Sequence, residues 1–156
     1  RSIWEYTEPK VIATHFDPRD VPGAILSIDT MHPGTNIHRE SGHWEWAGPE
    51  YQHYQRDFTS RALVAVELQV TDPAGAADIW GRVTGDPVRS GPSGPELILD
   101  NARIRFVPVL DDRGPGPRSV DVLPQNRNAI LNAAEARGQR IDDDTVMLCG
   151  VRINLL

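Results

Sequence analysis

The stretch that decides the fold is residues 64–85, VAVELQVTDPAGAADIWGRVTG. In its first seven residues every second side chain is Val or Leu, and the residues between them are Ala, Glu and Gln, which predicts a strand with one face packed on a core. Asp72 is a favourable N-cap, and Pro73 is a favourable first helical residue. An apolar stripe that includes Trp80 then runs to Gly85, which is placed to end the helix. The stretch therefore predicts a strand followed by a capped helix.

The same pattern occurs a second time further along the chain. Val120 and Val122 mark a second strand, Asn126 caps a second helix, and Gly138 ends it. The offset from Val66 in the first copy to Val120 is 54 residues. A repeat of this length indicates a duplicated structural unit.

Each predicted helix is followed by strand-like segments. Residues 85–95 are rich in Gly and Pro and predict a loop, and hairpins are expected to turn at 100–101 and at 149–150. The predicted fold class is therefore α+β, with paired βαβββ modules that form a curved mixed sheet and carry their helices on its outer face.

Composition and charge restrict the possible partners. The chain has 156 residues, enough for one domain with its own core, and a net charge of −6. This charge disfavours nucleic acid and anionic membranes, which are bound by basic surfaces. No apolar run approaches the roughly 18 residues that a membrane span needs. Cys149 has no second cysteine to form a disulfide with, so a cytoplasmic location is expected.

The order of these elements resembles a known family. Strand, capped helix with Trp80, hairpin, strand, second helix and the final GVRINL strand (150–155) are similar to the glyoxalase-like, vicinal oxygen chelate (VOC) superfamily. The segment HFDPRDVPGAIL (15–26) is similar to the closing hairpin of another such domain. The resemblance implies the C-terminal part of a two-domain member.

The resemblance also implies domain boundaries. Residues 61–156 would be the VOC domain, 31–60 a linker, and 1–30 the closing strands of a preceding module. Because strands 1–30 would leave unpaired edges, a homodimer or a missing N-terminal domain is expected as a partner.

Active members of the superfamily usually bind a divalent metal through His and Glu on the cupped sheet face. The resemblance places the usual His at Ala65 and near Ser119, and the usual Glu at Asn154 and near Ser27. Alanine cannot ligate a metal, and the Ser and Asn oxygens are weak neutral ligands. We therefore expect no metal and no other cofactor in this domain.

Strand alternation assigns a set of polar residues to the cup of the sheet. These are Glu67, Gln69, Arg103, Arg105, Asp121, Arg152 and Asn154. Glu67 or Asp121 could act as a catalytic general base if burial raised its pKa. Ligand binding is assigned to Gln69, Arg103, Arg105, Arg152 and Asn154, because guanidinium groups pair with carboxylates and phosphates. The alternative is a salt network with no ligand.

Three functions remain open at this stage. The chain could be a glyoxalase, lyase or isomerase type of enzyme acting on a small anionic or oxygenated metabolite. It could be a metal-free binding module that sequesters an antibiotic or another small molecule. It could also be a degenerate domain that supports an active upstream domain. In the first two cases, the partner is a small molecule.

Four of the five histidines lie between residues 32 and 53, among several glutamates. No pair has the spacing of a known zinc motif, so a polar linker with incidental histidines is the preferred interpretation. Trp44 and Trp46 are expected to pack this linker onto a domain, and His15 is expected to be structural.

Overall fold

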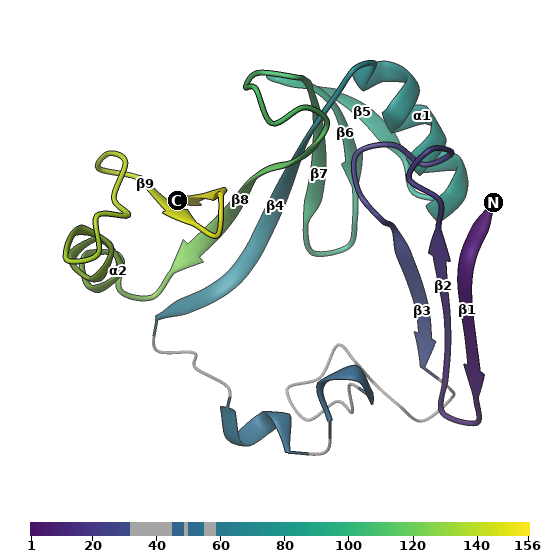
Figure 1. Cartoon of the computed structure of the whole chain (residues 1–156), viewed down its shortest axis with the longest axis horizontal. Helices are drawn as coiled ribbons and strands as arrows, with labels where there is room; N and C mark the ends of the chain where they lie inside the picture. Colours follow the sequence, from purple (N-terminus) through teal and green to yellow (C-terminus); the bar gives the residue numbers. More distant parts are fainter. Residues whose placement is uncertain (32–44, 49, 55–58) are drawn as a thin grey trace. The chain divides into compact units, whose positions relative to one another are not determined.

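The computed structural model describes residues 1–31, 45–48, 50–54 and 59–156. They form two compact units, each with its own sheet (Figure 1). The first unit comprises Arg1–Val21 and Ile25–Arg56, and the second comprises Pro22–Ala24 and Asp57–Leu156.

The first unit contains a three-stranded antiparallel sheet in the order β1-β2-β3. Its strands are β1 (Ser2–Glu8), β2 (Val11–Phe16) and β3 (Ser27–Met31). Two short 3₁₀ helices follow, η1 (Glu45–Ala47) and η2 (Tyr51–Tyr54). The strands thus form one antiparallel meander.

The second unit contains a seven-stranded curved mixed sheet in the order β5-β6-β7-β4-β8-β10-β9 (Figure 1). Its elements are β4 (Ser60–Val70), α1 (Pro73–Thr84), β5 (Val88–Gly91), β6 (Gly94–Ile98), β7 (Arg103–Pro108), β8 (Gly116–Pro124), α2 (Arg127–Glu135), β9 (Thr145–Leu148) and β10 (Val151–Leu155). We call β4-α1-β5-β6-β7 the first module and β8-α2-β9-β10 the second module. The antiparallel β4–β8 pair joins them at the centre of the sheet.

The two modules share one pairing pattern. β4 runs parallel to β7 in the first module, as β8 runs parallel to β10 in the second. An antiparallel neighbour follows in each case, β6 beside β7 and β9 beside β10. The counterpart of β5 in the second module is a single bridge between Arg140 and Val146. The predicted duplication is therefore present, with one strand of the second copy reduced to a bridge.

The predicted loop at 85–95 is wrong. Strand β5 lies within this segment, and β6 begins at Gly94, so the two strands form a tight hairpin. Gly94 has a φ of 134°, which side chains rarely adopt. At Gly91 an added Cβ would collide with the Glu96 carboxyl group. These glycines permit the two strands to approach closely in a hairpin, whereas the sequence prediction interpreted them as part of an irregular loop.

Both helices cover the same face of the sheet. A row of paired apolar residues crosses this face, formed by Leu97, Ile104, Val66, Val120, Ile153 and Val146. At one end of the sheet, Trp80 of α1 packs edge-on against Phe106, with ring centroids 5.7 Å apart. At the other end, Leu131 and Ala134 of α2 pack with Val146. The predicted α+β fold class is confirmed.

Three of the four predicted helix boundaries agree with the capping residues in the sequence, but α2 ends at Glu135, before the predicted Gly138. The Asp72 side chain accepts a hydrogen bond of 3.0 Å from the Gly75 N–H, and Asn126 accepts one of 3.0 Å from the Ala129 N–H. Gly85 ends α1 in the left-handed conformation, with a φ of 83°. The caps therefore define both helix starts as predicted.

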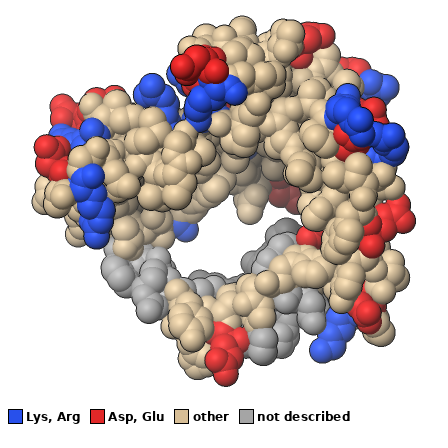
Figure 2. Space-filling view, viewed as in Figure 1, with Lys and Arg blue, Asp and Glu red and all other residues tan. Residues whose placement is uncertain are grey.

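Acidic and basic side chains lie next to each other on the face shown in Figure 2. The described part of that face presents no extended basic patch of the kind that binds nucleic acid. The helices of the described residues are all too short or too polar to cross a membrane.

Candidate functional site

The face of the sheet opposite the helices is polar, and we call it the cup face. Two paired rows of residues cross it from β6 to β9. One row is Glu96, Arg105, Glu67, Ser119, Arg152 and Met147, and the other is Ile98, Arg103, Ala65, Asp121, Asn154 and Thr145. Gln69 follows Glu67 on the same face of β4. The structure thus places all seven sequence-predicted site residues on one face.

The centre of the cup face is an ion-pair network around Arg105. Its Nε lies 3.3 Å from Glu67 Oε2, and its Nη1 lies 2.7 Å from Asp121 Oδ2. Arg118 pairs with the other oxygen of Glu67. Glu67 and Asp121 are only 7% and 6% exposed. Each carboxylate is therefore nearly buried, and each faces a guanidinium.

Asp121 is held in its ionised form. The Asn154 Nδ2 donates a hydrogen bond of 2.7 Å to Asp121 Oδ1, and the Thr145 hydroxyl lies 3.5 Å from the Asn154 Oδ1. Burial alone would raise the pKa of Asp121, but the hydrogen bonds from Arg105 and Asn154 and the charge of Arg105 lower it below its ordinary value. A general base needs a pKa raised toward neutrality, so this environment suits Asp121 poorly for that role.

Gln69 positions a loop. Its Nε2 donates hydrogen bonds of 2.7 Å to Asp111 Oδ1 and 2.7 Å to the Gly114 carbonyl, and its Oε1 accepts one of 3.2 Å from the Leu110 N–H. Hydrogen bonds from Arg113 and then from Gln69 hold the pKa of Asp111 well below its usual range. The amide of Gln69 is thus bound by the chain itself.

The Arg152 and Ser119 side chains of the cup face have no hydrogen-bonding partner among the described residues. Arg152 makes no hydrogen bond or ion pair within the described part of the chain. Ser119, its neighbour in the β8–β10 register, has a buried hydroxyl with no hydrogen-bond partner among the described residues. Unpartnered buried hydroxyls are rare in proteins. Within the described residues, this pair therefore leaves hydrogen-bonding capacity unused on the cup face of the second module.

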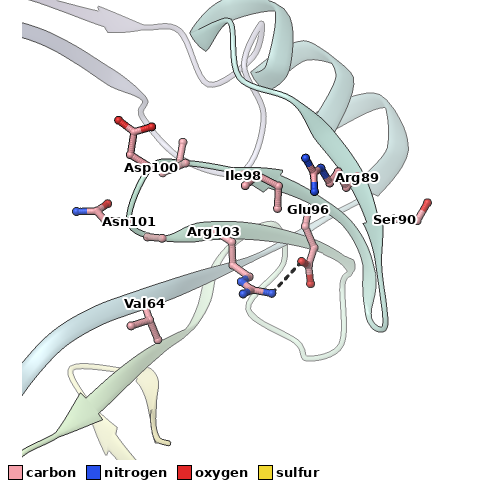
Figure 3. A pocket seen from close by; sticks show the side chains of 10 residues that line it. Val64, Arg89, Ser90, Glu96, Ile98, Asp100, Asn101 and Arg103 are labelled. Atoms are coloured by element: carbon pink, nitrogen blue, oxygen red, sulfur yellow. Dashed lines mark hydrogen bonds and ion pairs between the residues drawn. The ribbon is translucent and has the colours of Figure 1, made fainter.

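A pocket of about 590 Å³ opens at the β6–β7 end of the cup face (Figure 3). Arg103 and Glu96 point toward each other there, with Nη1 3.4 Å from Oε2. Arg89 on β5 lies beside Glu96 and makes no hydrogen bond or ion pair with any described residue. The pocket also contains Val64, Ser90, Ile98, Leu99, Asp100, Asn101 and Ala102.

The sequence analysis missed three charged residues of this face. Arg89 and its neighbour Glu96 meet because β5 and β6 pair, whereas the sequence predicts a loop around Arg89. Arg118 reaches Glu67 where the β4–β8 register shifts between Glu67 and Leu68. Strict alternation cannot predict a side chain that a bulge redirects. In the sequence, the apolar Val88 followed by the polar Arg89 is the sign of a strand at this point.

The cup face does not fit the divalent metal that the family resemblance implies. Ala65 has no ligand atom, and the Asn154 side chain is bonded to Asp121 and Thr145. The Arg105 guanidinium lies between the two central carboxylates and compensates their charge. Among the described residues, no three His, Cys, Asp or Glu side chains gather as a metal site would require. Of the histidine-rich segment, residues 32–44 lie outside the described residues.

No protein-family model matches the chain, and no curated protein matches it. Among solved structures, the chain is similar to the crystal structure of methylmalonyl-CoA epimerase from Mycobacterium tuberculosis. The identity is 18%, the TM-score is 0.49, and the match covers 66% of this chain and 91% of that chain. The strand order and register therefore define the fold, and the cup face provides the evidence for a function.

Proposed function

We propose that the chain is a glyoxalase-like (VOC) protein that binds a small anionic or oxygenated metabolite on the cup face without a metal. The observation that carries this proposal is the pocket lined by Arg89 and Arg103. Its volume of about 590 Å³ lies in the range of small-molecule sites. Of the arginines predicted to bind a ligand, Arg103 lines this pocket and makes one long ion pair among the described residues, whereas Arg152 lies outside the pocket.

The chemistry of the pocket favours a ligand with a carboxylate or phosphate group. The side chain of Arg103 is 54% exposed, and its one ion pair, to Glu96, is long at 3.4 Å. Arg89 is exposed and lacks a partner within the described residues. A carboxylate or phosphate of the ligand would accept hydrogen bonds from these two planar guanidinium groups, which bind such oxygens bidentately. Ile98 and Val64 offer an apolar wall for the rest of the ligand.

Binding is favoured over catalysis by the state of the two candidate bases. Glu67 contacts two arginines, and Asp121 contacts Arg105 and Asn154. Proton abstraction would require one of these carboxylates to leave its partners, which costs free energy in a buried network. The proposed activity is therefore reversible binding, with Glu67 and Asp121 as a support that orients Arg105.

Calorimetry of the native chain tests this function. The titrants are small dicarboxylates, 2-oxo acids and acyl phosphates, each compared with its neutral amide or ester. We expect at least one anion to bind and its neutral analogue to bind much more weakly. Arg103→Ala should abolish most of the binding. Arg82→Ala is the matched control, because Arg82 is exposed, pairs among the described residues only with Asp78 on the same helix, and lines no part of the pocket.

Absence of heat with every anion would refute the proposal. Equal losses for Arg103→Ala and Arg82→Ala would do the same, because they would indicate a general charge effect.

A second candidate function is support of a further domain or of a second copy of the chain. The observation that favours it is the separate β1-β2-β3 sheet, whose outer strands pair with no other described strand. In this proposal 1–30 are closing strands of another module, 31–60 a linker and 61–156 the VOC domain. Light scattering over a range of concentrations tests the homodimer. A constant monomer mass over this range would rule out the second copy.

A further inference from the structure

The first unit has a pocket of its own on the β1-β2-β3 sheet. Its volume is about 320 Å³, and its lining is formed by Trp4, His15, Ser27, Asp29 and Trp46. Trp4, His15 and Ser27 pair across the three strands, and the next row contains Tyr6, Ala13 and Asp29. The pocket therefore lies on one face of this sheet, and Trp46 contacts that face from η1.

The indole rings of Trp4 and Trp46 line the pocket, and Tyr6 contacts both rings without being part of the lining. Trp4 and Tyr6 are stacked, with centroids 5.7 Å apart and planes 11° apart. Trp46 stands across them, 5.3 Å from the Tyr6 ring at 61° and 6.3 Å from the Trp4 ring at 58°. The three residues are 42%, 37% and 41% exposed. The Trp4 ring also contacts the His15 imidazole, with centroids 4.6 Å apart, and the partial exposure of Trp4 and Trp46 leaves part of each indole accessible to a ligand.

Asp29 adds a fixed negative charge to the pocket. Its Oδ2 accepts a hydrogen bond of 2.7 Å from the Trp46 Nε1, and its Oδ1 accepts one from the Ser27 hydroxyl. It forms no ion pair within the described residues. In the same unit, Asp17 is paired with both Arg1 and Arg19. The charge of Asp29 is therefore oriented by neutral donors, and no described cation compensates it.

We propose that this pocket binds a quaternary or alkylated ammonium group. Such a cation is attracted by the negative faces of the two Trp rings, and the Asp29 carboxylate adds to that attraction. Methyl groups on the nitrogen favour the aromatic wall, because they leave the cation weakly hydrated and apolar at its surface. The predicted role of Trp46 as packing for the linker is compatible with this site, since its indole both lines the pocket and holds Asp29.

Two isosteric titrants separate the charge from the shape of the ligand. Choline and 3,3-dimethyl-1-butanol have nearly the same size, but only choline carries a positive charge. Calorimetry of the complete native chain should show choline binding about tenfold more tightly than the alcohol, the difference expected for cation–π attraction in a partly desolvated site. This comparison uses no variant and therefore does not depend on how substitutions affect folding.

Matched variants then locate the site. Asp29→Asn removes the charge but keeps one acceptor oxygen for the Trp46 Nε1, and its amide can donate to the Ser27 hydroxyl, so it should weaken choline binding and leave binding of the alcohol unchanged. Glu8→Gln removes the same charge from the same face of β1 outside the pocket lining, and choline binding should persist. Trp46→Leu should remove most of the affinity, and Trp46→Phe should restore part of it.

Three outcomes would overturn the proposal. Equal affinity for choline and the alcohol would indicate an apolar pocket without cation recognition. No binding of either compound would indicate that the rings pack only for the unit itself. Equal weakening by Asp29→Asn and Glu8→Gln would indicate attraction to the acidic chain in general.

Discussion

The two modules of the larger unit place equivalent positions on the cup face and fill them with different chemistry. In the first module Ala65 pairs with Arg103 and Glu67 pairs with Arg105; in the second Ser119 pairs with Arg152 and Asp121 pairs with Asn154. The adjacent strand supplies Glu96 in the first module and Thr145 in the second. Arg103 therefore has an acidic neighbour, and Arg152 has none among the described residues. The duplicated backbone thus preserves positions without preserving their charges.

The helix sides of the modules differ in the same way. The first module fills its core with Trp80 and Phe106, and the indole Nε1 also donates a hydrogen bond of 2.9 Å to the Pro22 carbonyl. The second module has Leu131 and Ala134 in the corresponding layer. A groove of about 410 Å³ also runs beside α2. The first module is therefore expected to contribute more of the packing free energy.

The largest expected effect tests this difference in packing. Trp80→Ala should lower the free energy of unfolding by about 3–5 kcal/mol. Leu131→Ala should lower it by about 2–3 kcal/mol, because this substitution leaves a smaller cavity and the side chains beside the α2 groove can move to fill it. Urea denaturation followed by circular dichroism measures both values. A loss below about 1 kcal/mol for Trp80→Ala would contradict the packing of α1 against Phe106.

The next effect concerns the junction between the modules. Arg105 of the first module pairs with Asp121 of the second, so Arg105→Met should lower the free energy of unfolding by about 2–3 kcal/mol by leaving charged acceptors unpaired. Changing Asp121→Asn as well should recover part of this loss. If the double variant is no more stable than Arg105→Met alone, the pair does not couple the modules.

The same pair predicts a dependence on pH. Asp121 has a lower pKa in the folded chain than in the unfolded chain, so its stabilisation is fully present above the unfolded value of about 3.9 and is lost as pH falls through the lower folded value. The stability difference between the native chain and Arg105→Met should therefore be constant near neutral pH and shrink below about pH 4. Denaturation midpoints measured across this range check the sign.

Much of this fold could be predicted because the sequence signals were local. Alternation in β4 assigned both faces of the sheet, and Asp72, Gly85 and Asn126 define helix ends through their own backbone contacts. Strand β5 could not be predicted this way. Its Gly91 is suited to the approach of Glu96 from a neighbouring strand, and that contact depends on the hairpin being formed.

The candidate site was predictable in its position and less so in its partners. Arg103 and Arg105 are two residues apart and identical in type, yet one lines a pocket and the other is nearly enclosed by Glu67 and Asp121. This difference depends on which strands lie beside β7. Neighbouring strands that are distant in sequence determine whether a guanidinium is paired, so alternation alone could not separate the arginine that lines the pocket from the one held in ion pairs.

Ligand binding compares the two equivalent arginines directly. Arg103→Ala should lower the affinity for an anion found in the calorimetric screen by about tenfold to a hundredfold. This is the loss expected when a hydrogen bond between charged groups is removed. Arg152→Ala should have a smaller effect, because Arg152 does not line the pocket. A larger effect at Arg152 than at Arg103 would move the binding site to the unpaired Arg152 and Ser119 of the second module.

The smallest effect concerns the equivalent helix caps. Asp72 and Asn126 each accept one hydrogen bond of 3.0 Å from the third residue that follows. Asp72→Ala and Asn126→Ala should therefore each lower the free energy of unfolding by about 1 kcal/mol. If the two modules unfold as one cooperative unit, the two substitutions should lower its free energy of unfolding equally, because each cap then stabilises the entire unit. If α2 opens separately, hydrogen exchange of Asn126→Ala should accelerate only in the second module, and its effect on global unfolding should fall below that of Asp72→Ala.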